Sequence, residues 1–394
     1  MNRNMESASA CLSVYELGAV GDGAADDTKA LQAAIDLGAE QGRAVWFPAG
    51  RYRTGELFLR PGSCLKAEPQ WGFRYETTGS SLLIQRDERQ ACILNLSHAN
   101  GATLDGLSLT GENLPGGCCG ILSNRADFGP IEDAYRIERC RAARFSGHAV
   151  SLDRAWCFTI RHNMFCFSGG DGLRLHGWDG FVLDNWFSGN RGAGFGSAGD
   201  NCSVTMTGNR IEWNQECGIR ILGGSHYNIT GNYIDRSGGP GILLAPCTVR
   251  DDDSGREERR IPNTCTITGN IVYRSGKFAR TPEESCQLRM EHAAGVTVTG
   301  NSFCLGRDDK GKGLLSPDVG MLLSGLRDCV VTGNTLFMGA RKELVRDCGG
   351  HASGVIIRDN VGSLYPEEAA ASPAPGLPTN LILDFDQELK NWFA

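Results

Sequence analysis

The chain has 394 residues and a formal net charge of −7, with 41% hydrophobic and 22% charged residues. These proportions are ordinary for a globular protein. Because the chain carries a net negative charge and not an excess of Lys and Arg, neither nucleic acid nor an anionic membrane surface is expected as a partner. The 53 glycines are about twice the usual share of roughly 7%, which indicates many short turns.

The N-terminal segment predicts neither export nor membrane insertion. It lacks the apolar run of about seven residues that a secretory signal contains, and no stretch of the chain approaches about 18 apolar residues. We therefore expect a cytoplasmic protein whose 16 cysteines are free thiols, packed as small apolar side chains. No CxxC pair is present, so we expect no structural zinc site. No cofactor is expected, apart from the calcium that an acidic segment considered below allows.

The segment DDTKALQAAIDLGAEQG (26–42) predicts a helix. Asp26 and Asp27 are acids of the kind that begin helices, and apolar residues follow them at helical spacing. The next stretch, VWFPAGRYRTGELFLRPG (45–62), predicts the first strands of a sheet. We expect the helix to cover an exposed sheet end, as part of an N-terminal cap over about residues 1–62, because an open end invites edge pairing.

An eight-residue pattern then recurs along the chain. It appears as VTMTGNRI, YNITGNYI, CTITGNIV, VTVTGNSF and CVVTGNTL, starting at positions 204, 227, 265, 296 and 329. With three looser copies, the aligned asparagines are Asn163, Asn185, Asn209, Asn232, Asn270, Asn301, Asn334 and Asn360, which lie 22 to 38 residues apart. Such periods indicate a solenoid, and the alternation of apolar residues within each copy favours strands over helices.

Each copy predicts a strand, a turn and a second strand, with the Gly-Asn pair at the turn because both residues tolerate a left-handed backbone. Stacked copies place their asparagines about 4.8 Å apart, which predicts a ladder of side-chain amides. A third strand precedes each copy, as in GLRLHG, GAGFGS, GIRILG, GILLAP, QLRMEH and GMLLSG. Three strands in a rung of about 22 residues predict an all-β, single-stranded parallel β-helix, and the longer intervals predict loop insertions.

The last part of the chain differs in composition. We expect the β-helix to form one domain over residues 1–366. Residues 367–394 follow it as a Pro/Ala-rich linker and an apolar tail, LILDFDQELKNWFA, which either caps the C-terminal end or binds a neighbouring subunit. A homo-oligomer, either a dimer or a trimer, is therefore left open.

The N-terminal stretch ELGAVGDGAADDTKALQAAID, followed by AVWFPAGRYRTGELFLRPG, resembles the start of the pectate lyase-3 superfamily. This resemblance covers about 50 residues and implies a right-handed parallel β-helix with an N-terminal helical cap. The superfamily includes polysaccharide lyases, polygalacturonase-like glycoside hydrolases, mannuronan epimerases and phage tailspikes, so the resemblance implies a carbohydrate substrate. The chain has neither the adjacent Asp pair of the hydrolases at a strand end nor the Asp-Pro-His-Glu run of the epimerases.

Aligning the third strands predicts where a site lies. Outward residues of these strands form columns, in which Asp153 stands one rung from His176, at roughly 5 Å. Arg174 is two residues from His176 and therefore on the same face. Arg220 lies two rungs from Arg174.

The strand between those two rungs is expected to present Gly194 and Gly196 to the same face. Because neither residue has a side chain, we expect a hollow there.

Asp153, Arg174, His176, Arg220 and Asp171 are our candidate catalytic residues. A carboxylate beside His176 suits it for proton transfer, and arginines can hold a uronate carboxylate and stabilise an enolate. This set favours β-elimination, with epimerisation if the proton returns from the other face.

Four further residues are candidate substrate-binding residues because they lie in turns beside the same face: Trp178, Asp179, Asp200 and Glu212. The many carboxylates also allow a glycoside hydrolase, which needs two of them roughly 5 to 10 Å apart. A carbohydrate-binding or structural β-helix without catalysis is the third reading. The acids of DDDSGREERR (251–260) allow calcium, and GRDDKGKG (306–313) is expected to be a loop beside the groove.

Overall fold

The structure, a computed structural model, describes residues 11–73, 79–250, 255–276, 278–304 and 317–365. The chain forms two compact units, residues 1–165 and 166–394, and both are built from short parallel strands. The predicted all-β parallel β-helix with an N-terminal helical cap is confirmed. Among the described residues, no helix is long and apolar enough to cross a membrane.

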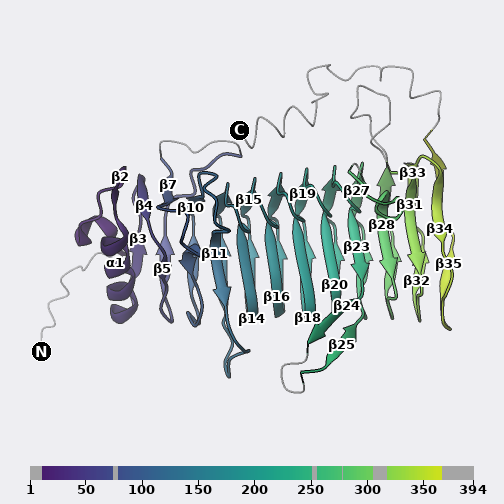
Figure 1. Ribbon diagram of the computed structural model, residues 1–394, viewed down its shortest axis with the longest axis horizontal. Coiled ribbons are helices and arrows are strands. Elements are labelled where there is room, and N and C mark those ends of the chain that lie inside the picture. The colour runs from purple at the N-terminus through teal and green to yellow at the C-terminus, as the bar shows by residue number, and fades with distance from the viewer. Residues whose placement is uncertain (1–10, 74–78, 251–254, 277, 305–316, 366–394) are drawn as a thin grey trace, which may run out of the picture. The chain divides into compact units, whose positions relative to one another are not determined.

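The first unit begins with the cap and continues into rungs (Figure 1). Its elements are β1 (Cys11–Ser13), the 3-10 helix η1 (Val14–Leu17), β2 (Asp22–Asp26), α1 (Thr28–Gln41), β3 (Ala44–Trp46), β4 (Gly50–Thr54), β5 (Leu57–Phe58), β6 (Cys64–Lys66), β7 (Ser81–Gln85), β8 (Cys92–Asn95), β9 (Thr103–Asp105), β10 (Ser108–Thr110), β11 (Cys119–Asn124), β12 (Tyr135–Glu138), β13 (Arg141–Ala143), β14 (Val150–Arg161) and β15 (Met164–Cys166), the last of which ends at the unit boundary. The strands β2, β4, β7, β10 and β13 pair in parallel, and so do β1, β3, β6, β9 and β12.

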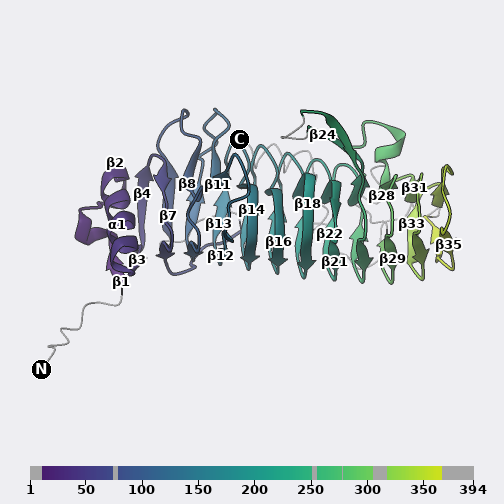
Figure 2. The ribbon, with the colours of Figure 1, turned by 90° about the horizontal axis from the view of Figure 1, so that it is seen from below.

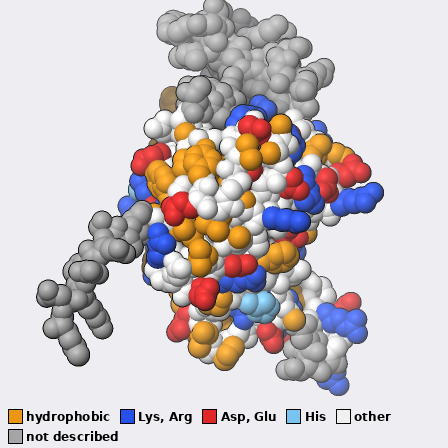
Figure 3. Space-filling view, turned by 90° about the vertical axis from the view of Figure 1, so that its left-hand side faces the viewer, with side chains coloured by type: hydrophobic (Ala, Val, Ile, Leu, Met, Phe, Trp, Pro, Cys, Tyr) orange, Lys and Arg blue, Asp and Glu red, His pale blue; other side chains and the backbone are white. Residues whose placement is uncertain are grey.

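The helix α1 is the predicted cap, and it buries one apolar stripe, made of Leu31, Ala34, Ile35 and Gly38. Asp26 accepts a hydrogen bond from the amide of Thr28, the first helical residue, at 3.0 Å. Asp27 is buried and instead accepts from the amides of Val20 and Gly21, at 2.6 and 3.1 Å, so it fixes the preceding turn. At this end of the unit, charged side chains of both signs are interspersed with apolar ones (Figure 3).

The second unit repeats a rung of three strands. The first side of the coil contains the starts of β16 (Leu173–Leu183) and β18 (Phe195–Thr207), followed by β20 (Ile219–Ser225), β23 (Ile242–Ala245), β28 (Cys286–Glu291), β31 (Val319–Ser324) and β34 (Glu343–Asp347). The second side contains the ends of β16 and β18, then β21 (Asn228–Thr230), β26 (Thr266–Thr268), β29 (Thr297–Thr299), β32 (Val330–Thr332) and β35 (Ile356–Arg358). The third side contains β17 (Trp186–Ser188), β19 (Arg210–Glu212), β22 (Tyr233–Asp235), β27 (Ile271–Tyr273), β30 (Ser302–Cys304), β33 (Thr335–Ala340) and β36 (Val361–Leu364).

The asparagines of the repeat stack as predicted. In the second unit each side-chain Nδ2 donates to the Oδ1 of the asparagine one rung on, at 2.8 to 3.1 Å. The ladder runs through Asn185, Asn209, Asn232, Asn270, Asn301, Asn334 and Asn360. Each Oδ1 also accepts the backbone amide of the asparagine one rung before it, at 2.9 to 3.2 Å, so these amides are satisfied although most of them are buried.

The residue that turns the backbone is the one before each asparagine, and not the asparagine itself. It has a φ of 64° to 70° where it is glycine, as at Gly208 and Gly269, and of 54° where it is Asp184. The threonines and the apolar residues of successive copies are in register, for example Thr207 opposite Thr230. Inward apolar side chains thus form continuous buried columns, as the alternating pattern predicts.

A hairpin interrupts the regular coil. The strands β24 (Cys247–Arg250) and β25 (Glu257–Arg260) pair antiparallel and stand away from the stacked strands (Figure 2). This hairpin occupies the insertion between Asn232 and Asn270. A second insertion carries the 3-10 helix η2 (Pro282–Glu284), which precedes β28. The loop expected at 306–313 and the tail at 367–394 lie outside the described residues, and the single-domain expectation for residues 1–366 stays a prediction.

Candidate functional site

Arg220, on β20, is the centre of a small ion-pair network. Its Nη2 lies 2.9 Å from Oδ2 of Asp171, and its Nη1 bonds to Oε2 of Glu216. Asp171 is only 3% exposed, and its Oδ1 accepts a hydrogen bond from the amide of Ala193 at 2.7 Å. Both carboxylate oxygens of Asp171 are thus bonded within the protein, one of them to Arg220, which suits a residue that positions this arginine.

The predicted glycine hollow is wrong, and so is the register on which it rested. Arg174 is opposite Gly196, which is opposite Arg220, so the glycine strand is shifted by two residues from the expected alignment. A Cβ at Gly196 would lie 2.4 Å from Oδ2 of Asp171 and 2.9 Å from Nη2 of Arg220. The space above Gly196 is therefore filled by the ion pair, and Gly194 faces the packed interior, 2.4 Å from Ile211 by the same measure.

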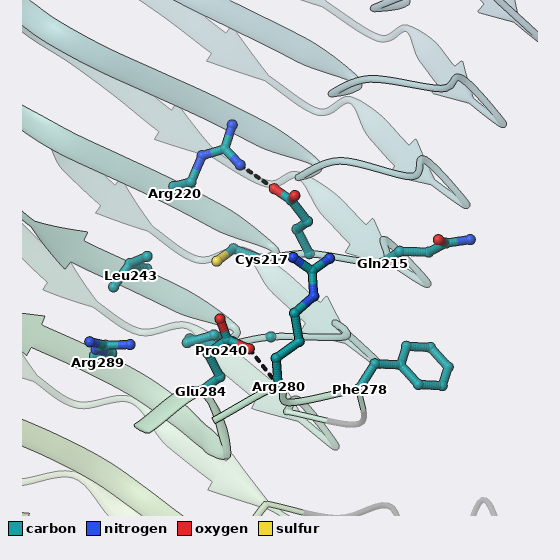
Figure 4. A pocket seen from close by; sticks show the side chains of 11 residues that line it. Gln215, Cys217, Arg220, Pro240, Leu243, Phe278, Arg280, Glu284 and Arg289 are labelled. Carbon is teal, nitrogen blue, oxygen red and sulfur yellow. Dashed lines mark hydrogen bonds and ion pairs between the residues drawn. The ribbon is translucent and has the colours of Figure 1, made fainter. Parts of the chain in front are cut away.

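A pocket of about 170 Å³ lies beside this network, and we call it the arginine pocket. It is lined by Gln215, Glu216, Cys217, Arg220, Gly239, Pro240, Leu243, Phe278, Arg280, Glu284 and Arg289. Figure 4 shows Arg220, Arg280 and Arg289 around it; they come from β20, from the loop before η2 and from β28.

The three arginines of this pocket differ in their partners. Arg220 is held as described above, and Arg289 forms an ion pair with Glu291 at 2.8 Å. In the described part of the chain the guanidinium of Arg280 makes no ion pair, and only its backbone amide is bonded, to Glu284 at 2.7 Å. Burial raises the pKa of Cys217 to about 12, so its thiol stays protonated at neutral pH.

A second pocket, of about 370 Å³, is lined by Trp178, Asp200, Asn201, Cys202, Gly224, Ser225, Arg260, Ile261 and Asn263. We call it the tryptophan pocket. The indole Nε1 of Trp178 donates to the backbone oxygen of Asp200 at 2.7 Å. Arg220 and Ser225 are five residues apart on β20, and the backbone turns between them at Gly223 and Gly224, so about 17 Å is the upper limit of their separation along the chain.

The structure thus divides the predicted site residues of the second unit. Arg220 and its partner Asp171 belong to the arginine pocket, and Trp178 and Asp200 to the tryptophan pocket. Asp179 is exposed at the corner after Trp178, with a φ of 54°.

Two predicted residues lie on β16, outside both pockets. His176 is half-buried there, on the same face as Arg174. Arg174 is exposed and has no hydrogen-bond or ion-pair partner among the described residues.

Asp153 belongs to the first unit, where it lies on β14 opposite Asn124 of β11. Its Oδ2 is 3.6 Å from Nη1 of Arg154. The expected pairing of Asp153 with His176 joins residues of different units and stays a prediction.

Glu212 does not flank the same face as the other candidates, which corrects the sequence-based expectation. It lies on β19, on the third side of the coil, and is buried. Its carboxylate accepts from Nε1 of Trp186 and Nε of Arg210, both at 2.9 Å, and burial raises its pKa. It lines neither of the two pockets, because a residue at the end of the strand after the asparagine turn faces the third side.

Sequence reasoning missed the contribution of the loop before η2. Phe278, Arg280 and Glu284 line the arginine pocket, yet none of them belongs to a repeated strand. The one signal for them is the 31-residue interval from Asn270 to Asn301, which is too long for a plain rung.

Metal ligands do not gather in the described residues. No group of three or more His, Cys, Asp or Glu side chains there has the arrangement that a metal ion requires. Of the acidic segment expected as a calcium candidate, residues 257–260 form β25, and residues 251–254 lie outside the described residues. All 16 cysteines are free thiols, and many are buried.

Two families match parts of the chain. The family described as "Right handed beta helix region" matches residues 146–336, and "Rhamnogalacturonase A/epimerase, pectate lyase-like" matches residues 11–59. A "Glucan 1,3-beta-glucosidase" of Cochliobolus carbonum is 40% identical over 63 residues, which are 16% of this chain and only 8% of that relative's length.

Solved structures share the fold over most of the chain. The A-module of mannuronan C-5 epimerase AlgE4 from Azotobacter vinelandii superposes with a TM-score of 0.61 at 19% identity, covering 90% of this chain and 100% of that one. DFA-IIIase from Arthrobacter chlorophenolicus, in complex with DFA-III, superposes with a TM-score of 0.63 at 14% identity, covering 88% of this chain and 86% of that one. The enzymatically active domain of tailspike protein 2 of bacteriophage CBA120 superposes with a TM-score of 0.65 at 17% identity, covering 84% of this chain and 49% of that one.

These identities are too low to show more than a common fold. The stacked three-strand rungs, the helical cap and the two matched families agree with one another. Together they show a right-handed parallel β-helix and support the resemblance to the pectate lyase-like superfamily.

Proposed function

We propose that the protein is an enzyme that acts on uronate-containing oligosaccharides, with β-elimination as the favoured reaction. The observation that carries this proposal is the arginine pocket, in which three guanidinium groups surround one small cavity and that of Arg280 has no ion pair among the described residues. A guanidinium presents a planar pair of N–H donors that matches a carboxylate, so an arginine left unpaired at a pocket suits a carboxylate ligand.

Cations beside a bound carboxylate also favour elimination chemistry. Removal of the proton at C5 of a uronate places negative charge on that carboxylate, as an enolate, and preorganised donors stabilise charge that develops in this way. Arg220 is preorganised by Asp171 and Glu216, and Arg280 adds a guanidinium that has no ion pair within the described ranges. The electron pair of the C5–H bond then forms the C4–C5 double bond, and the oxygen at C4 leaves with the rest of the chain.

The base in this pocket is proposed to be a glutamate. Arginines stay protonated in proteins, and the thiol of Cys217 is protonated as well, so neither can accept the C5 proton. Glu216 and Glu284 are the carboxylates that line the cavity. Arg174 and His176, which lie on a neighbouring part of the same face, are then proposed to contact the sugars that flank the reacting one.

The neighbours support a carbohydrate substrate through their names. They include a mannuronan C-5 epimerase, a DFA-IIIase crystallised with DFA-III and a glucan 1,3-beta-glucosidase. Epimerisation at C5 of a uronate begins with the same proton abstraction as β-elimination, so the two reactions make similar demands on a site.

A second candidate function is glycoside hydrolysis. It is favoured by the presence of two glutamates, Glu216 and Glu284, in the same pocket, because hydrolysis needs one acid and one base or nucleophile. Water is then added across the glycosidic bond and no double bond forms.

The test measures both products in the same reaction. The protein is incubated with uronate and neutral oligosaccharides, with added calcium and with a chelator, while the ultraviolet absorbance of the C4–C5 double bond and the number of reducing ends are followed. Elimination gives both signals, and hydrolysis gives reducing ends alone. We propose that no cofactor is needed, so the chelator should leave the rate unchanged. A folded protein that gives neither signal would contradict both functions and favour a binding module.

The variant Arg280→Gln connects the activity to the pocket. It should raise KM for uronate substrates by about tenfold, equivalent to about 1.4 kcal/mol, because a carboxylate loses its charged partner. Arg358→Gln is the matched control, since Arg358 is 73% exposed and lies on β35, outside both pockets. Equal behaviour of the two variants would place uronate recognition elsewhere.

A further inference from the structure

We infer that the tryptophan pocket is a separate subsite for a neutral sugar, so that the ligand of this protein contains both neutral and uronate residues. The inference rests on the proposed function, because it extends the same substrate from the arginine pocket to the other end of the β20 strand.

The aromatic group of this pocket is held in a fixed orientation. Trp178 is half-buried on β16, and its indole N–H is bonded to the backbone oxygen of Asp200 at 2.7 Å. The backbone before it is fixed too, since Gly177 donates its amide to Oδ1 of Asn201 at 2.9 Å. A rigid, partly exposed indole loses little entropy when a flat apolar ring packs on it, which suits the C–H face of a sugar.

The polar lining carries no net charge. The carboxylate of Asp200 accepts from Nε of Arg260 at 2.5 Å and from Nη2 at 3.4 Å, and Nη1 of Arg260 bonds to Glu258, so the arginine of the pocket is already held by two carboxylates. The remaining polar groups are the amides of Asn201 and Asn263 and the hydroxyl of Ser225. Amides and hydroxyls have both donors and acceptors, as sugar hydroxyls do, and they offer nothing specific to a carboxylate.

The β24–β25 hairpin forms one wall of this pocket. Arg260 is the last residue of β25, and the hairpin packs tightly on the corner of the coil below it. A Cβ at Gly223 would lie 2.9 Å from Cβ of Arg260 and 3.0 Å from Sγ of Cys247. Each pocket therefore has one wall from an inserted segment: the hairpin at the tryptophan pocket, and the loop that carries Arg280 at the arginine pocket.

The two pockets differ in charge and are lined by opposite ends of β20, no more than about 17 Å apart along the chain. One offers an arginine without an ion pair among the described residues, and the other offers an indole with neutral hydrogen-bonding groups. A chain of uronates alone would leave a charged carboxylate facing the second pocket with no cation free to meet it. A mixed oligosaccharide matches both.

The experiment is a calorimetric titration of the full chain with three ligands: a neutral oligosaccharide, a uronate-only oligosaccharide and a mixed one. Trp178→Ala should weaken the neutral and mixed ligands by about tenfold and leave the uronate-only ligand unchanged. Phe181→Ala is the matched control, because Phe181 is a 51% exposed aromatic on the same strand that lines neither pocket. Trp178→Phe keeps a ring and should retain most of the affinity, which separates lost stacking from misfolding.

The outcomes distinguish this inference from the function on which it rests. If Trp178→Ala affects no ligand, or all three equally, the neutral subsite is overturned, whereas a selective loss of uronate binding in Arg280→Gln would still support the proposed function. If only neutral ligands bind, and Trp178→Ala abolishes that binding, the uronate function fails and the subsite stands. If none of the three ligands binds to the folded protein, the inference is overturned.

Discussion

The ion pair between Asp171 and Arg220 leads to a prediction for the variant Asp171→Asn. The amide keeps an oxygen for the Ala193 N–H but turns an NH₂ group toward the guanidinium of Arg220, so one charge-assisted bond is lost. The pair is little screened because the Asp171 side chain is 4% exposed. Arg220 is 26% exposed and keeps Glu216, so it is not left without a counter-charge, and the full penalty for breaking a buried pair does not apply.

We expect a loss of about 2 kcal/mol in the free energy of unfolding, the usual value for a bond to a charged group. For a cooperative unit of about 200 residues this lowers the melting temperature by roughly 4 to 8 °C. Differential scanning calorimetry measures it. Glu343→Gln is the matched control. Glu343 forms a 2.8 Å ion pair with Arg346, but the two side chains are 44% and 34% exposed, so the pair contributes less than about 1 kcal/mol.

The same variant has a kinetic consequence. If Asp171 positions Arg220, KM for uronate substrates rises while the shape of the pH–rate profile stays the same. A melting temperature equal to that of wild type, or a profile that loses one limb, would refute the assignment of Asp171 as a positioning residue.

Three further predictions concern buried groups. Asn232→Ala should lower the free energy of unfolding by about 3 kcal/mol or more, because it removes hydrogen bonds of 3.0 Å to both the carbonyl of Met206 and Oδ1 of Asn270. Urea unfolding measures this loss, and a loss below about 1 kcal/mol would contradict the stabilising role of the ladder. Burial raises the pKa of Glu212, so its stabilising contribution is complete below its ordinary value of 4.5 and is lost as the pH rises through the raised value. Glu212→Gln should therefore gain stability relative to wild type as the pH rises above about 4.5, and a difference in melting temperature that does not change with pH would exclude this. Cys217→Ala should retain activity because the wild-type thiol is protonated, and a loss of turnover without a loss of stability would show a chemical role for it.

The rung, the asparagine ladder and the helical cap could all be predicted from the sequence. Each of these depends on local spacing: alternate apolar residues face the interior of any strand, and a copy repeated in register brings like residues together. The same spacing correctly predicts that Arg174 and Arg220 share one outward column. Alternate residues of a strand face opposite sides of the sheet, so the face that a residue occupies can be predicted without knowing the neighbouring strands.

The register of the glycine-rich strand was decided only by the tertiary structure. Gly192, Gly194 and Gly196 stand at every second position, so the strand fits its neighbours equally well after a shift of two residues. Packing selects the observed alignment, in which Phe195 stacks between Leu173 and Ile219 and the ion pair crosses over Gly196.

The walls of both pockets were likewise decided by the tertiary structure. Arg280 and Arg260 reach the pockets from inserted segments whose lengths the repeat reveals but whose paths it does not. A side chain on a strand has its direction set by the pleat. The direction of a side chain on an inserted loop depends on how the loop packs against the coil, and this packing depends on contacts with residues distant in sequence.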